Sequence, residues 1–123
     1  MADLASVLVE ELGDFQVVRL AGEVDISNAD QLEMEISGVV RNDAVGLVLD
    51  LSGIEFMDSA GIRMLFDLRT RLGARRQRLT LAVPQDSLIR GSLVVTEVDR
   101  LLPLHATPEE GLESLRSGEP SND

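Results

Sequence analysis

Cysteine, tryptophan, tyrosine and lysine are missing from the 123-residue chain, and histidine occurs once, as His105. Without cysteine there is no disulfide, no thiolate nucleophile and no thiolate ligand for a metal. Without lysine there is no amine for a Schiff base or for the phosphate-binding loop of a nucleotide-binding enzyme. A single histidine does not suffice for a histidine metal site, and we expect it on the surface, at the end of a strand remote from any serine.

Negative charge dominates the composition. Asp and Glu total 22 residues against 11 arginines, so the formal net charge is −11 at pH 7. Such a surface repels nucleic-acid phosphates and anionic lipids, and the three phenylalanines offer no platform for stacked bases. No apolar run approaches the roughly 20 residues of a membrane span, and the first residues do not resemble a signal peptide. We therefore expect a cytoplasmic protein that binds neither nucleic acid nor membranes.

The order of the apolar runs predicts one α/β domain over residues 1–116, followed by a polar, frayed tail at 117–123. Two β-rich runs flank a Gly13-Asp14 turn and predict an antiparallel hairpin. Later strands alternate with helices, which predicts parallel strands joined by right-handed crossovers. The fold class is therefore a mixed β-sheet with about four helices packed on it. The expected strands are 7–9, 15–20, 45–51, 79–83 and 101–105, and the expected helices end near residues 40, 73, 95 and 116, the third beginning near residue 85.

Two short segments, 22–27 and 56–61, each follow a strand and open a helix. In open α/β sheets, ligand contacts gather at the carboxyl ends of the strands, where the next helices begin. We therefore expect Asp25 and Ser59 at the same end of the molecule. The Ser59 hydroxyl should point outward, beside free backbone N–H groups that would tolerate an anion.

Simpler roles for these residues are also open. Asp25 or Ser27 can cap the first helix, and Asp58 can cap the second, with no function beyond stability. Gly61 fits such an interpretation less well, because glycine in a helix costs about 1 kcal/mol relative to alanine. Its presence in the first turn predicts the close approach of another backbone.

An enzymatic interpretation finds little support in the residues. Asp25, Asp50 and Asp58 could be combined into a Mg²⁺ site, but no lysine is present to bind phosphoryl oxygens. A serine nucleophile would need a base, and His105 is expected elsewhere. We expect no catalytic residue, no resident metal and no cofactor.

Several segments resemble the anti-sigma factor antagonists of the STAS family. These are Gly-Glu-Val-Asp at 22–25, Leu-Asp-Leu-Ser-Gly-Ile at 49–54, Phe-Met-Asp-Ser-Ala-Gly-Ile at 56–62, and the segment 96–104. The resemblance extends over roughly residues 7–115, and its most specific element is Asp-Ser-x-Gly. It implies a STAS-like sheet, which agrees with the fold class that the pattern predicts independently.

The resemblance implies a binding protein in a partner-switching circuit. Such antagonists bind an anti-sigma factor that is also a serine kinase, holding ATP or ADP, and so release a sigma factor. The kinase phosphorylates the serine that follows Asp in the Asp-Ser-x-Gly element, which is Ser59 here, and a PP2C-type phosphatase reverses the modification. The resemblance places Asp25 near the partner's nucleotide pocket. The expected partner-binding residues are Asp25, Ile26, Ser27, Asp58, Ala60, Gly61, Ile62 and Arg63.

The chain departs from the family pattern at two positions. Arg63 stands where many relatives have glycine or another small residue, which could tune the choice of partner. Glu97 stands where glycine is common, and costs about 1 kcal/mol if the turn there needs a positive φ. The alternative function is that of a STAS subunit in a stressosome or a transporter-associated complex. We expect a monomer or a weak homodimer.

Overall fold

The computed structural model describes residues 5–118, so most of the tail predicted to fray (119–123) lies outside the described residues. In the described part, five strands and four α-helices follow one another in the order that the sequence predicts. The elements are β1 (Ala5–Leu12), β2 (Phe15–Val24), α1 (Ala29–Val39), β3 (Gly46–Met57), α2 (Ser59–Ala74), β4 (Arg78–Ala82), α3 (Arg90–Val95), the short 3₁₀ helix η1 (Val98–Arg100), β5 (Leu104–His105) and α4 (Pro108–Arg116).

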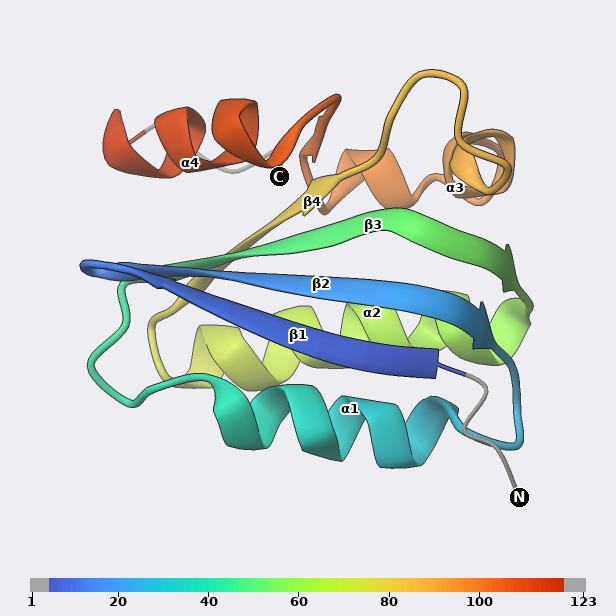
Figure 1. The fold of residues 1–123 in the computed structure, drawn as a ribbon, viewed down its shortest axis with the longest axis horizontal. Coiled ribbons are helices and arrows are strands. Elements are labelled where there is room, and N and C mark those ends of the chain that lie inside the picture. Colours follow the sequence, from blue (N-terminus) through green and yellow to red (C-terminus); the bar gives the residue numbers. More distant parts are fainter. Residues whose placement is uncertain (1–4, 119–123) are drawn as a thin grey trace.

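The strands form one sheet in the order β1-β2-β3-β4-β5, with β1 antiparallel to β2 and all other pairs parallel. The predicted fold class is therefore confirmed. Helices α1 and α2 lie side by side on one face of the sheet, and α4 lies on the other face (Figure 1). Because β3 is covered on both faces, residues 46–51 are all buried, as their continuous apolar pattern predicts.

The second half of β3 differs from the prediction, which ended this strand at residue 51. The strand continues to Met57, but its pairing with β2 shifts register twice, each time by one extra residue on β3. Leu51, Ile54 and Met57 consequently all enter the main core, at a spacing of three residues. A regular strand has a period of two and would have placed Glu55 inside instead.

Two further predictions near the C-terminus are wrong in extent. The third helix begins at Arg90 instead of near residue 85, because residues 84–89 form turns in which the Ser87 hydroxyl accepts a hydrogen bond from the Ile89 N–H at 3.2 Å. The last strand contains only Leu104 and His105. Between these elements, Glu97 adopts a φ of 62°, so this turn does place glutamate in the left-handed region.

None of the described helices is long and apolar enough to cross a membrane. His105 is half-buried on the edge strand β5 instead of fully exposed. Its Nε2 atom is buried and has no hydrogen-bond partner among the described residues.

Candidate functional site

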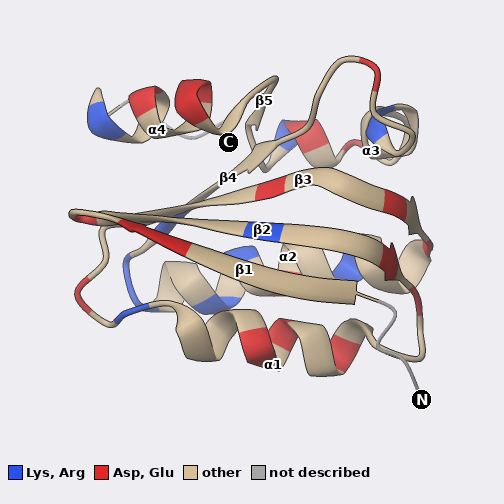
Figure 2. Cartoon of the chain, in the orientation of Figure 1, with Lys and Arg blue, Asp and Glu red and all other residues tan. Residues whose placement is uncertain are grey.

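The segments that follow β2 and β3 meet at one edge of the sheet. Val24 and Met57 are paired in the parallel register, and the Asp58 N–H donates a hydrogen bond to the Val24 carbonyl at 3.2 Å. Asp25 and Ser59 therefore follow the ends of two neighbouring strands, and they lie at the same end of the molecule, as the sequence analysis expects. Figure 2 shows acidic residues at the carboxyl ends of both strands.

The first turn of α2 is capped by Asp58. Its Oδ1 atom accepts hydrogen bonds from the Ala60 N–H at 2.9 Å and the Gly61 N–H at 3.2 Å. This carboxylate therefore already occupies N–H groups that the sequence analysis expected to be free for an anion. A second anion at this helix start would lie beside the first, without those donors.

Ser59, the first residue of α2, is exposed. Its hydroxyl makes no hydrogen bond to any residue in the described range, and no described histidine or lysine lies beside it to act as a base. The hydroxyl is thus accessible to a reagent from outside the chain.

Gly61 is buried by side chains, which corrects the expectation of an approaching backbone. A Cβ atom at this position would lie 2.4 Å from Cγ of Met57 and 3.2 Å from Cγ1 of Val24. The glycine therefore lets α2 settle directly onto the ends of β2 and β3. Packing at this glycine therefore determines how closely the turn that carries Ser59 lies against the sheet.

The loop after β2 is held by its own polar side chains. Asp25 Oδ1 accepts hydrogen bonds from the Ser27 N–H at 2.8 Å and the Ser27 hydroxyl at 2.5 Å, and Asn28 Oδ1 accepts from the Asp25 N–H at 2.9 Å. Helix α1 begins only at Ala29, after an Asn28 that makes no side-chain cap. The predicted capping of α1 by Asp25 or Ser27 is therefore wrong, because both side chains are engaged within the loop.

Ile26, at the tip of this loop, is the most exposed large apolar side chain of the described residues, at 84%. It faces a groove between the starts of α1 and α2. The groove is lined by Ile26, Asp30, Ser59, Ala60, Arg63, Met64 and Asp67.

Only part of the predicted partner-binding set lines this groove. Ile26, Ala60 and Arg63 line it together with Ser59, whereas Gly61 is buried and Ile62 packs partly against the core. Asp25 and Asp58 hold the loop and the helix start in place beside it.

The sequence analysis missed two acidic groove residues, Asp30 and Asp67. One signal was available for Asp67, because Ser59, Arg63 and Asp67 are spaced four residues apart and share one face of a helix. Arg63 Nε lies 3.8 Å from Asp67 Oδ2, and both side chains are largely exposed. No comparable sequence signal pointed to Asp30, which reaches the groove from another helix.

The three aspartates considered for a Mg²⁺ site are not brought together. Asp50 lies in the middle of β3, where it pairs with Arg19 at 3.4 Å and accepts a hydrogen bond from the Ser52 N–H. Within residues 5–118, no group of three or more His, Cys, Asp and Glu side chains is placed to hold a metal ion.

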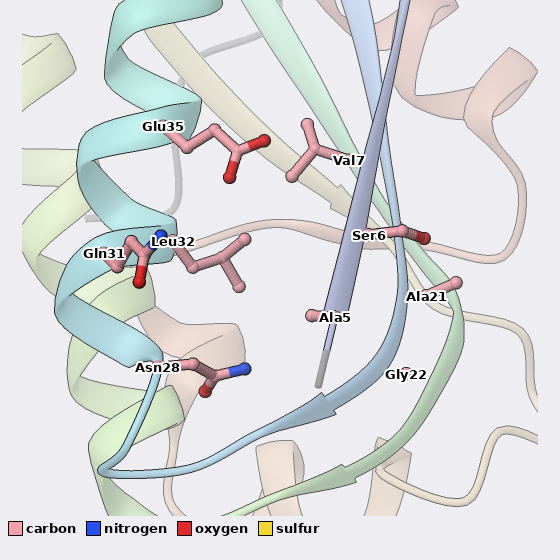
Figure 3. Close-up of a pocket in the computed structure, with 9 residues that line it drawn as sticks. All are labelled: Ala5, Ser6, Val7, Ala21, Gly22, Asn28, Gln31, Leu32 and Glu35. Carbon is pink, nitrogen blue, oxygen red and sulfur yellow. The ribbon is translucent and has the colours of Figure 1, made fainter. Parts of the chain in front are cut away.

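A second hollow, of about 500 Å³, lies between β1 and α1 (Figure 3). Leu32 and Glu35 of α1 point toward β1, and Val7 points back toward them. This hollow includes Asn28 at the start of α1, but neither Ser59 nor Arg63 lines it. The Ser59 groove is therefore a separate feature of the surface.

Comparison with known proteins gives a consistent result. Residues 6–111 match the model of the STAS domain. The anti-sigma-F factor antagonist RsfB of Mycobacterium tuberculosis is 28% identical over 116 residues, which cover 94% of this chain and 93% of RsfB.

Among solved structures, an anti-sigma factor antagonist from Mycobacterium paratuberculosis superposes with a TM-score of 0.76 at 31% identity, covering 91% of this chain and 94% of that one. The phosphorylated form of the Bacillus cell fate determinant SpoIIAA gives a TM-score of 0.64 at 24% identity, covering 90% of this chain and 100% of that one. At that identity, the second similarity concerns the fold alone.

Proposed function

Because the chain belongs to the STAS domain family, we propose that it is an anti-sigma factor antagonist, a binding protein switched by phosphorylation of Ser59. Its similarity to RsfB and to the Mycobacterium paratuberculosis antagonist extends over nearly its whole length, which supports this assignment. The unmodified chain binds an anti-sigma factor that is also a serine kinase, and the bound sigma factor is released. The protein acts as one domain, in the cytoplasm, as a monomer or weak homodimer.

The observation that carries the proposal is the exposed Ser59 hydroxyl at the edge of a groove. In the kinase reaction, Ser59 Oγ loses its proton and forms a bond to the γ-phosphorus of ATP, and ADP leaves. A PP2C-type phosphatase then breaks that phosphorus–oxygen bond with water, which restores the hydroxyl and releases inorganic phosphate. The antagonist supplies only the hydroxyl, so it needs no catalytic residue or cofactor of its own.

The partner surface combines an apolar contact with charge. Ile26, Ala60 and Arg63 face the groove directly, and burial of Ile26 against the partner would remove its exposed surface from water. Asp25, Ser27, Asp58, Gly61 and Ile62 act by shaping the loop and the helix start that present these contacts.

Phosphorylation weakens binding through local charge. A phosphoserine carries about −1.5 to −2 charges at pH 7, and here it would lie near the carboxylates of Asp30, Asp58 and Asp67. Two unit charges about 6 Å apart repel by roughly 0.7 kcal/mol in water and by about 3 kcal/mol at an effective dielectric of 20. When a partner docks, water is excluded and the effective dielectric around these charges falls, so the repulsion grows. A loss of about a hundredfold in affinity for the partner therefore needs no large rearrangement.

The test begins with the unmodified chain as bait in a lysate of the source organism, followed by mass-spectrometric identification of the bound protein. The purified partner is then incubated with radiolabelled ATP and either the parent chain or Ser59→Ala. We expect an anti-sigma factor that labels the parent and leaves Ser59→Ala unlabelled. A stressosome or transporter subunit in the pull-down, or equal labelling of both chains, would contradict the proposal.

A further inference from the structure

Arg63 is the one cation among the described residues that line the Ser59 groove. The charged groups around it are Asp30 from α1, Asp58 at the start of α2 and Asp67 one turn further along α2. Its present partner is Asp67, at 3.8 Å, and the arginine side chain is 82% exposed. Ion pairs so exposed contribute little to stability, so Arg63 is held only weakly in this position.

The geometry of a helix favours a different partner for this arginine. Each Cα–Cβ bond in an α-helix tilts toward the N-terminus, so a long side chain covers the turn that precedes it. For Arg63, that turn begins at Ser59, four residues earlier. An i,i+4 ion pair is also stronger when the anion precedes the cation, and the pair of Arg63 with Asp67 has the opposite order.

A phosphate on Ser59 would have few other groups to bind. The N–H groups of Ala60 and Gly61 donate to Asp58 at 2.9 and 3.2 Å, so two of the anion-binding donors of this helix start are already engaged. The carboxylates of the groove repel the phosphate. Arg63 then offers a positive charge at the favourable spacing and in the favourable order.

We propose that Arg63 exchanges Asp67 for the phosphate when Ser59 is phosphorylated, which rests on the proposed phosphorylation of that residue. Modification then changes the groove in two ways, because it adds negative charge and also withdraws the cation that faces a partner. The unmodified state presents Arg63 to the partner, and the modified state ties it to the chain's own phosphate.

The experiment isolates this exchange from any kinase or partner. Phosphoserine is incorporated at position 59 during translation, and the second pKa of the phosphate is measured by phosphorus NMR over a pH titration. A nearby guanidinium stabilises the dianion, so Arg63→Gln is expected to raise this pKa by about 0.3 unit relative to the parent phosphoprotein. The Nε–H signal of Arg63 should follow the same titration.

Arg100→Gln is the matched control. Arg100 is also exposed and also paired with a carboxylate, Glu97 at 2.9 Å, but it lies on η1 outside the groove. Its substitution should leave the phosphate titration unchanged. Equal phosphate pKa values in the parent and in Arg63→Gln would overturn the proposal.

A double-mutant cycle tests the exchange itself. Asp67→Asn frees Arg63, so it should lower the phosphate pKa more in the parent than in the Arg63→Gln background. Equal effects in both backgrounds would show that Asp67 and the phosphate do not compete for the arginine. These titrations need no partner, so a phosphoprotein that still bound the anti-sigma factor tightly would refute the proposed function without altering their result.

Discussion

Helices α2 and α4 both begin with a side-chain cap, but the residues of their first turns differ. Thr107 caps α4 by accepting a hydrogen bond from the Glu110 N–H at 3.2 Å, and Pro108 and two glutamates fill the first turn. Asp58 caps α2, but the first turn that follows is Ser59-Ala60-Gly61, with no acidic residue. The start of α4 is thus built from residues that favour a helix, whereas the start of α2 is built from small residues that leave room for contact.

The difference shows how one local structure can serve stability or recognition. In α4, charge of the favourable sign lies in the first turn, and the Thr107 hydroxyl accepts a hydrogen bond from the Glu110 N–H. In α2, the only favourable charge is the cap itself, and the next side chain is an exposed hydroxyl. A helix start that omits the usual stabilising residues is therefore a better indicator of a site than the cap alone.

The largest expected effect comes from an additional carboxylate at the start of α2, compared with one at the start of α4. Ser59→Asp should fold normally and lose about a hundredfold in affinity for the anti-sigma partner, because the charge is added among Asp30, Asp58 and Asp67. Ser59→Ala should bind in the presence or absence of ATP. Calorimetry measures both, and Thr107→Asp, which retains a capping side chain at α4, is the control that should bind like the parent.

A smaller effect is expected from the glycine beneath the site. Gly61→Ala places a methyl group where Met57 now lies, at 2.4 Å from its Cγ, and should destabilise the fold by about 2 kcal/mol. Gly73→Ala on the same helix meets no atom within 4 Å and should instead stabilise the fold, by up to about 1 kcal/mol. Urea unfolding of the two variants compares them, and changes of the same sign would contradict the packing described for α2.

The exposed side chain of Ile26 should contribute to partner binding but not to the stability of the fold. Ile26→Asn is expected to lower partner affinity about tenfold, since it replaces an apolar contact, and to leave the unfolding free energy nearly unchanged. Leu88 is similarly exposed, at 77%, but lies outside the groove, so Leu88→Asn should bind normally. If both variants bound equally well, Ile26 would not be part of the interface.

The smallest effect concerns the caps themselves. Asp58→Ala and Thr107→Ala each remove a side-chain cap and should each cost about 1 kcal/mol of unfolding free energy. Only Asp58→Ala should also weaken partner binding, because it disturbs the turn that carries Ser59. Thermal unfolding together with calorimetry separates the two outcomes, and a Thr107→Ala variant with reduced affinity would remove the distinction between the helix starts.

The order of strands and helices along the chain, the hairpin, the helix cap at Asp58 and the shared edge of Asp25 and Ser59 were all predictable, because each follows from the pattern along the chain. The length of β3 was not, because Leu51, Ile54 and Met57 follow a period of three that matches neither a regular strand nor a helix. The start of α1 was misjudged because the side chains of Asp25 and Ser27 bond to each other within the loop. Whether such a side chain binds within the loop or caps the helix depends on the three-dimensional shape of the turn.

The candidate site was predicted as two segments, and the structure adds what lies between them. Asp30 belongs to neither segment and reaches the groove only because α1 packs beside α2. Gly61 was identified as unusual, but the atoms that require it belong to Val24 and Met57, on different strands. Contacts that join separate elements are fixed by packing, so they could not be read from spacing along the chain.

The two irregularities in β3 make this segment tolerant of a change in its length by one residue. Each adds one residue, and together they return Met57 to the same face of the sheet as Leu51. Loss of one extra residue would make the pairing regular at that point and would leave Met57 opposite Val24, on the core face. Removal of one of these extra residues should therefore preserve the point at which α2 starts.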